Sequence, residues 1–153
     1  MSHGRKLIRS AIATLLNTSP VAWTSVQETR IESPRQIWPY LMVFAESESS
    51  ELETIGTAGI YERAAIISVV GLLRLPGTGD TVSIEDKMDT MAVEIETKLT
   101  RSTLGATVRV GTLSLIATKM DVIIEEDGVD HAELNMTWAV SYSTAEGASE
   151  VLI

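Results

Sequence analysis

The sequence predicts an α+β fold: a mixed or antiparallel sheet crossed by one main amphipathic helix, with a shorter helix at the N-terminus. Two observations predict it. Residues Ala132 to Thr144 alternate apolar and polar side chains strictly, which is typical of a strand with one buried face. Residues Ile84 to Arg101 instead repeat apolar side chains at helical spacing. The elements follow the order αβββαββ with no repeat or dividing linker, so we expect a single domain over residues 1–153.

Size and composition allow a core without covalent support. A chain of 153 residues suits one domain, and the absence of cysteine excludes a disulfide framework and thiolate metal sites. The longest apolar run, Ala64 to Leu73, is interrupted by Ser68 and Gly71 and suits a buried strand better than a membrane helix. The basic, then apolar N-terminus superficially resembles a signal peptide, but Arg9 and Ser10 interrupt its apolar part. We therefore expect a soluble, uncleaved protein.

The N-terminal third is predicted to contain one helix and two strands. Residues Gly4 to Asn17 carry their apolar side chains on one side, as a surface helix does. Val21 to Ile31 is predicted as a strand that contains Trp23. Ile37 to Ala45 is predicted as a second strand, apolar on both faces. Pro39 belongs near the start of that strand or at a sheet edge, because proline has no backbone donor.

An exposed acidic loop is predicted at residues 46–59, ESESSELETIGTAG. The segment is acidic, rich in Ser and Thr, and ends with two glycines. It suits a long hairpin loop that is mobile in the isolated subunit. Two interpretations stay open: a tolerated insertion, or an arm that becomes ordered on a neighbouring subunit or another partner.

The remaining strands follow from apolar runs bounded by turn residues. Arg63 to Leu75 is predicted to be buried on both faces, and Leu113 to Glu125 forms a long strand before the final one. A C-terminal tail, residues 145–153, extends beyond the last strand.

The main helix carries its own start signals. Ser83 with Asp86 forms a variant of the capping box, and Lys98 complements the C-terminal end of the helix dipole. Its apolar stripe should lie across the sheet and includes methionines that suit core packing; the stripe consists of Ile84, Met88, Met91, Ala92, Ile95 and Leu99.

Charge is distributed unevenly along the chain. The net charge of −9 argues against a protein that grips nucleic acid through its phosphates. Basic residues concentrate before Arg35, whereas no Lys or Arg follows Lys119. The acidic end suits solvated strand edges and loops, or alternatively a dipolar subunit that associates head to tail or lines a channel.

The sequence predicts no catalytic residue, cofactor site or metal site. His3 lies near the terminus and His131 follows a turn, where we expect it to be solvated. Asp127, Asp130 and His131 could hold a cation, but their spacing fits neither a calcium loop nor a zinc site, and a polar turn is the simpler interpretation. The glycines of LPGTGD lack the lysine of a phosphate loop. We therefore do not expect an enzyme.

Several blocks of the sequence together resemble one family. They are LIRSAIATLL, IWPYLMVFAESE, YERAAIISVVGLL, IEDKMDTMAVEIETKL and EEDGVDHAELNMTWAVSYST. In this order and spacing they are similar to the tail terminator proteins of long-tailed bacteriophages, the lambda minor tail protein U type. The resemblance extends from about Leu7 to Thr144 and rests on hydrophobic pattern and length rather than on invariant residues. Residues 46–59, residues 101–113 and the C-terminal tail depart from it.

The resemblance implies a structural virion protein. It would form a homohexameric ring at the head-proximal end of the tail tube after assembly in the host cytoplasm, stop tube polymerisation and present a surface for head attachment. Its partners would be other copies of itself, the tail tube protein and a head-tail connector or neck protein. DNA would pass through the ring without specific binding, and an acidic lumen would suit that passage.

Charged residues are the predicted contacts between subunits or with partners. Acidic side chains of residues 46–59 would face basic ones elsewhere, and the set is Glu48, Glu51, Glu53, Arg5, Arg9 and Arg63. Three alternatives remain open: another neck or tail-completion protein that binds the portal side, a host α+β binding domain, and a small metal-dependent hydrolase that uses Asp127, Asp130 and His131.

Overall fold

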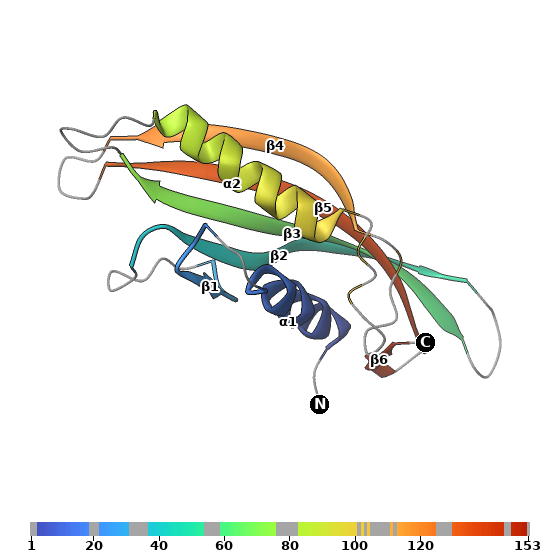
Figure 1. Ribbon diagram of the computed structural model, residues 1–153. Helices are drawn as coiled ribbons and strands as arrows, with labels where there is room; N and C mark the ends of the chain where they lie inside the picture. Colours follow the sequence, from blue (N-terminus) through green and yellow to red (C-terminus); the bar gives the residue numbers. More distant parts are fainter. Residues whose placement is uncertain are drawn as a thin grey trace.

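The computed structural model describes residues 3–18, 22–30, 37–53, 59–75, 83–100, 102, 104, 111, 113–124, 130–145 and 148–152, the backbone alone for 145 and 148–152. Two helices and six strands occur in these residues (Figure 1). They are α1 (Gly4–Leu16), β1 (Ser25–Gln27), β2 (Tyr40–Leu52), β3 (Ile60–Arg74), α2 (Ile84–Leu99), β4 (Ser114–Ile123), β5 (His131–Ala145) and β6 (Ala148–Leu152).

The strands form one mixed sheet in the order β1-β2-β3-β5-β4, and β6 pairs with the end of β5. The β1–β2 pair is parallel and the other pairs are antiparallel. The predicted α+β class and the order of elements are therefore confirmed, with β6 as an additional strand. Long pairing along β2, β3 and β5 explains the extended shape of the sheet in Figure 1.

Both helices pack on one face of the sheet. The main core joins the buried side of α1, the stripe of α2 and the alternating side chains of β5, of which Trp138 is fully buried. Gly71 of β3 faces this core, and a methyl group there would overlap the sulfur of Met91. The glycine that interrupts the apolar run thus leaves room for the side chain of Met91 to pack directly on the sheet.

Side-chain hydrogen bonds fix the ends of the helices. Ser83 accepts from the backbone N–H of Asp86 at 3.2 Å, as the capping box predicts. Trp23 is buried and donates through Nε1 to the carbonyl of Leu16 at 3.0 Å. Glu94 of α2 accepts from the backbone of Ala22 at 2.8 Å, so the chain between α1 and β1 is tied to both helices.

A second, smaller apolar cluster lies on the opposite face of the sheet. Tyr40, Met42, Val70 and Leu72 are buried there, and Trp38 packs against them. Strand β2 is therefore apolar on both faces where predicted, and Pro39 stands immediately before it. The strand predicted over residues 21–31 is much shorter, because β1 pairs with only three residues of β2.

The predicted loop at residues 46–59 is wrong in its first half. Strand β2 continues to Leu52, since residues 47–52 pair with residues 61–66 of β3. The polarity of residues 46–51 concealed this strand in the sequence, because these residues lie at an edge of the sheet, where a strand is held by backbone pairing with β3 and needs no buried apolar side chain at every second position. Residues 54–58 lie outside the described residues. The C-terminal tail also differs from its prediction, because residues 148–152 form β6.

A β-bulge at Glu46 separates the apolar and polar parts of β2. Ala45 pairs with Ile67 and Ser47 with Ile66, so Glu46 has no partner in the ladder. Its carboxylate accepts a hydrogen bond of 2.8 Å from the hydroxyl of Ser68, which is buried. The serine in the middle of an apolar strand therefore holds the bulge.

Candidate functional site

Residues 47–53 and 59–66 form a hairpin whose β2 side is mostly exposed. We call it the hairpin arm. Figure 1 shows it continuing beyond the ends of both helices. Because directly paired residues share a face, Glu48, Ser50 and Leu52 face the helix side, whereas Glu51 and its partner Glu62 face the opposite side.

At the base of the arm, Glu48 is the centre of a buried ion cluster. Its side chain is only 7% exposed. It accepts a hydrogen bond of 2.9 Å from Nη1 of Arg63 and another from the hydroxyl of Tyr142. Nε of Arg5 lies 3.5 Å and Nε2 of His3 3.9 Å from its oxygens. These contacts join β2, β3, β5 and the first turn of α1.

Arg63 is held from several sides within this cluster. Besides Glu48, it donates from Nε to Thr144 at 2.8 Å and from Nη1 to Ser50 at 3.1 Å. Its guanidinium lies 5.5 Å from the ring centre of Tyr61. Because the other contacts already fix the guanidinium of Arg63, its ion pair with Glu48 costs little additional side-chain entropy. The arm is therefore firmly attached at its base.

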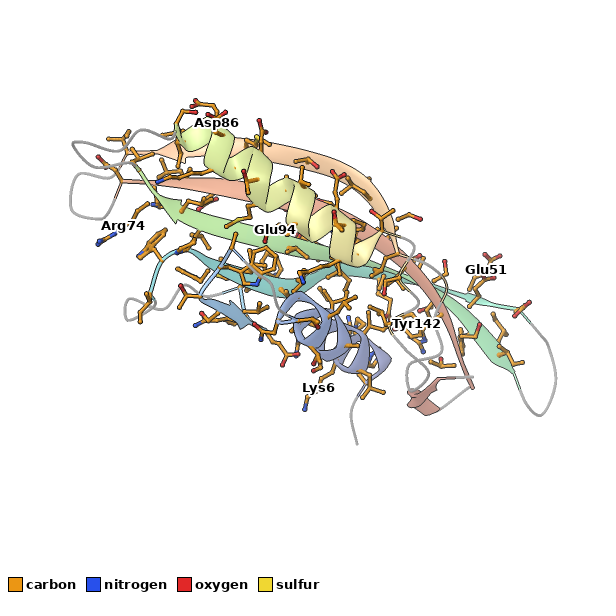
Figure 2. All side chains as sticks on the ribbon, in the orientation of Figure 1. Lys6, Glu51, Arg74, Asp86, Glu94 and Tyr142 are labelled. Carbon is orange, nitrogen blue, oxygen red and sulfur yellow. The ribbon has the colours of Figure 1, made fainter. Side chains whose placement is uncertain are left out.

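The hydroxyl of Tyr142 is in an unusual environment. Burial, and then the hydrogen bond to the carboxylate of Glu48, raise the pKa of Tyr142 well above its ordinary value. The phenol therefore stays protonated and acts as a donor to Glu48. Figure 2 shows Tyr142 between α1 and the hairpin arm, and Glu51 farther out along the arm.

The outer face of the arm carries uncompensated negative charge. Glu51 and Glu62 are directly opposite each other on neighbouring strands, and both are exposed. The β5 residue beside Glu62 is Ser143, which is neutral. Like charges at such positions destabilise a strand pair by roughly 0.2–1 kcal/mol. Nothing in the described part of this face offsets the repulsion with an ion pair.

A basic pocket lies at the other side of this region, beside the N-terminus of α1. It has a volume of about 430 Å³ and is lined by residues of α1, of the segment after β1 and of the edge of β2. Its charged lining consists of Arg5, Lys6, Arg9, Arg30 and Glu28, with His3 beside them. A concentration of cations is unexpected in a chain of net charge −9.

The cations of the basic pocket differ in how they are held. Arg30 donates to the carbonyl of Ala45 at 2.6 Å and lies over the ring of Phe44. Nε of Arg9 is buried and has no hydrogen-bond partner among the described residues. Lys6 is exposed and points away from the sheet in Figure 2. The pocket therefore combines a cation held by a hydrogen bond and a ring contact with an exposed one.

The six predicted interface residues fall into three groups. The structure brings Glu48, Arg5 and Arg63 together within one subunit, although Glu48 lies on a strand and not on an exposed loop. Glu51 and Glu53 are exposed on the hairpin arm. Arg9 lines the basic pocket.

Sequence reasoning missed the other members of the cluster, among which Tyr142 and Thr144 are buried polar residues. Their position at the end of a strictly alternating strand was the available signal, since an inward polar side chain needs a partner.

The predicted solvation of His131 is wrong. The residue is 3% exposed. Its Nε2 lies 3.2 Å from the carboxylate of Glu133, and its ring is 5.5 Å from that of Trp38. It starts β5 directly, so neighbouring strands cover it. Asp127 lies outside the described residues, and within them no group of three or more His, Cys, Asp or Glu side chains could hold a metal ion.

Strand β4 presents a second exposed surface of a different kind. Thr118, Met120 and Val122 pair with inward residues of β5 and so share the face on which the helices pack. Even so, Met120 is 40% and Val122 49% exposed, because the helices pack mainly against β2 and β5 and not against β4. No other strand in the described part of the chain pairs with the outer edge of β4.

Comparisons with known proteins give little beyond these observations. No protein family and no curated protein matches the sequence. Among solved structures, the chain is similar to one from a structure described as the virion of a native gene transfer agent particle. The two are 15% identical, the match covers 91% of this chain and 92% of that one, and the TM-score is 0.41. This likeness is too distant to support an argument, so the proposals below rest on this chain's own residues.

None of the helices among the described residues is long and apolar enough to cross a membrane.

Proposed function

We propose that this protein is a structural component of a phage virion, a tail terminator that closes the head-proximal end of the tail tube as a homohexameric ring. In this role it stops addition of tail tube protein and offers a docking surface to the head-tail connector. DNA passes through the ring without specific contacts. The sequence resemblance described above suggests the role, and the surface of β4 supports it.

The uncovered core face of β4 is the observation that carries the proposal. Leu115, Met120 and Val122 extend the apolar face of β5 beyond the cover of the helices. An exposed edge strand with apolar side chains is an aggregation hazard that soluble monomers usually block. A subunit that assembles with copies of itself covers such a face.

Capture on tail tubes tests the proposal. Purified protein is mixed with polymerised tail tube protein, imaged by negative-stain electron microscopy and sized by light scattering. We expect a ring of about six subunits at one end of each tube and no further elongation from that end. Binding to portal complexes but not to tubes would instead identify a neck protein, and binding to neither would contradict a role in tail completion.

A variant pair connects the result to β4. Met120→Lys with Val122→Lys places two charges on the apolar face and should abolish capping while the subunit stays folded, since both side chains are already partly in water. Val93→Lys is the matched control, because Val93 is an isolated exposed apolar residue of α2. If both proteins cap equally well, β4 is not the assembly surface.

A further inference from the structure

We infer that the outer carboxylates of the hairpin arm, Glu51 and Glu62, bind in the basic pocket of a neighbouring copy of this chain. The inference rests on the proposed function insofar as it requires copies that assemble. It adds a specific contact: carboxylates of one subunit against the guanidinium and ammonium groups of the next.

Charge complementarity is the first argument. The outer face of the arm offers two adjacent carboxylates with no cation beside them, and Glu53 follows next along the strand. The lining of the basic pocket has four permanent cations and one carboxylate, Glu28, although one of these cations, Arg5, already contacts Glu48 of its own subunit. Among the described residues, each surface therefore carries an excess of charge, and the two excesses have opposite sign.

Two features separate these surfaces within one subunit. Arg5 contacts Glu48 on the helix side of the arm, whereas Glu51 and Glu62 lie on the opposite face of the same two strands. Phe44, which lines the pocket beneath Arg30, is on the same face as Glu62, but at roughly 3.3 Å per strand residue it lies about 20 Å from Glu51 along β2. A contact between different surfaces of identical copies is heterologous, which is the type that generates rings.

The built-in cost of each surface is the second argument. Nε of Arg9 is buried and has no hydrogen-bond partner among the described residues, and an unpaired buried donor is unfavourable. The pair Glu51 and Glu62 is repulsive in the isolated subunit. Insertion of the arm would bring Glu51 and Glu62 close to the donors and cations of the pocket. One contact would then reduce both the repulsion between the two carboxylates and the cost of the unpaired donor.

A charge-swap experiment on the full chain tests the inference. The arm variant is Glu51→Lys with Glu62→Lys, and the pocket variant is Lys6→Glu with Arg30→Glu. The matched controls are Glu96→Lys on α2 and Arg74→Glu at the end of β3, both exposed; Figure 2 shows Arg74 at the end of the sheet away from the hairpin arm. Self-association is measured by sedimentation velocity, and circular dichroism verifies that each variant is folded.

We expect each variant alone to weaken self-association by about tenfold or more, because reversal creates like-charge contacts. An equimolar mixture of the two variants should restore it, since the reversed charges match again. Higher salt should weaken wild-type association. Unchanged association of either folded variant, or a mixture that stays dissociated, would overturn the inference.

The outcomes separate this contact from the proposed function. Wild-type protein that assembles and caps tubes, together with charge variants that do the same, removes the arm contact and leaves the tail-terminator role intact. Wild-type protein that neither assembles nor caps removes both. If the pocket variant loses retention on duplex DNA while its self-association is unchanged, the pocket holds phosphate rather than carboxylate, which also overturns the inference.

Discussion

The two outer regions of the sheet, the polar half of β2 and the strand β4, differ in how they are stabilised and in what they expose. Beyond Met42, no described strand pairs with the outer side of β2, and its side chains are polar or charged from Glu46 to Glu51. No described strand pairs with the outer edge of β4 either, yet β4 exposes Leu115, Met120 and Val122. The outer part of β2 therefore exposes polar and charged side chains, whereas β4 exposes apolar ones.

This difference shows that exposure is decided by what covers a strand and not by its composition alone. Glu48 is charged but buried, because the first turn of α1, β3 and β5 surround it. Met120 is apolar but exposed, because the helices end their cover at β5. A polar strand with an internal ion cluster and an apolar strand without cover are the complementary parts that an assembling subunit needs.

The largest expected effect is a difference in stability between substitutions in β5 and in β4. Met136 of β5 is fully buried, and Met120 lies on the same face one strand away. Met136→Ala should lower the free energy of unfolding by about 2–5 kcal/mol, because it leaves a cavity. Met120→Ala should change it by less than about 1 kcal/mol. Urea denaturation of both variants measures the difference. Equal losses would mean that β4 belongs to the core of the isolated subunit.

A smaller effect is expected at the base of the hairpin arm. Glu48→Gln keeps the shape of the side chain but leaves Arg63 without its countercharge, so the free energy of unfolding should fall by about 1–3 kcal/mol. Glu53→Gln is the matched control, since Glu53 is exposed, and it should be nearly neutral. Thermal denaturation of the two variants gives the comparison. If Glu48→Gln left the stability unchanged, the cluster would not stabilise the fold.

Tyr142 gives the cluster a dependence on alkaline pH. Its pKa in the folded protein is raised above that in the unfolded chain, about 10. The stabilisation is therefore complete below about pH 10 and is lost as the pH rises toward the folded pKa. Tyr142→Phe should lower the free energy of unfolding by about 1–2 kcal/mol near neutral pH, because it removes the hydrogen bond to Glu48. Above about pH 10 the stability of this variant should fall less steeply than that of the wild type. Chemical denaturation across this pH range measures the effect, with Tyr61→Phe as the control. If the stability of Tyr142→Phe and of the wild type fell in parallel above about pH 10, Tyr142 would not cause the alkaline dependence.

The smallest effect should have the opposite sign. Glu51→Gln removes one of two facing carboxylates on the outer side of the arm, so it should stabilise the isolated subunit by roughly 0.2–1 kcal/mol. Glu96→Gln on α2 is the control, since it removes an exposed carboxylate without a facing one. A loss of stability in Glu51→Gln would mean that this carboxylate already has a favourable partner.

Periodicity predicted most of the fold, because it reports which side chains of an element face a core. The stripe of α2 and the alternation of β5 both proved correct. It failed for residues 46–52, where a strand is held by backbone pairing and one ion cluster instead of apolar burial. It also could not predict that β4 is uncovered, since the length of α2 says nothing about where that helix lies on the sheet.

The candidate site was only partly predictable. Glu48, Arg5 and Arg63 were paired by charge, and they do meet, but inside one subunit. Tyr142 is 94 positions away from Glu48 in the sequence. The two side chains meet because β2 and β5 both pair with β3 and present these residues on the same face. Such a meeting depends on strand order and register, which local patterns do not contain.

The bulge at Glu46 gives strand β2 two phases. Odd-numbered side chains face the helices as far as Ala45, and even-numbered ones do so beyond the bulge. If Glu46 were instead paired in the ladder, Glu48 would face outward and Glu51 would face α1. Deletion of Glu46 would remove the bulge and leave both orientations unchanged, whereas deletion of one residue between Glu48 and Glu51 would turn Glu51 to the helix side. Chains whose arms differ in length between these two positions should therefore differ there by even numbers of residues, because side chains alternate along a strand.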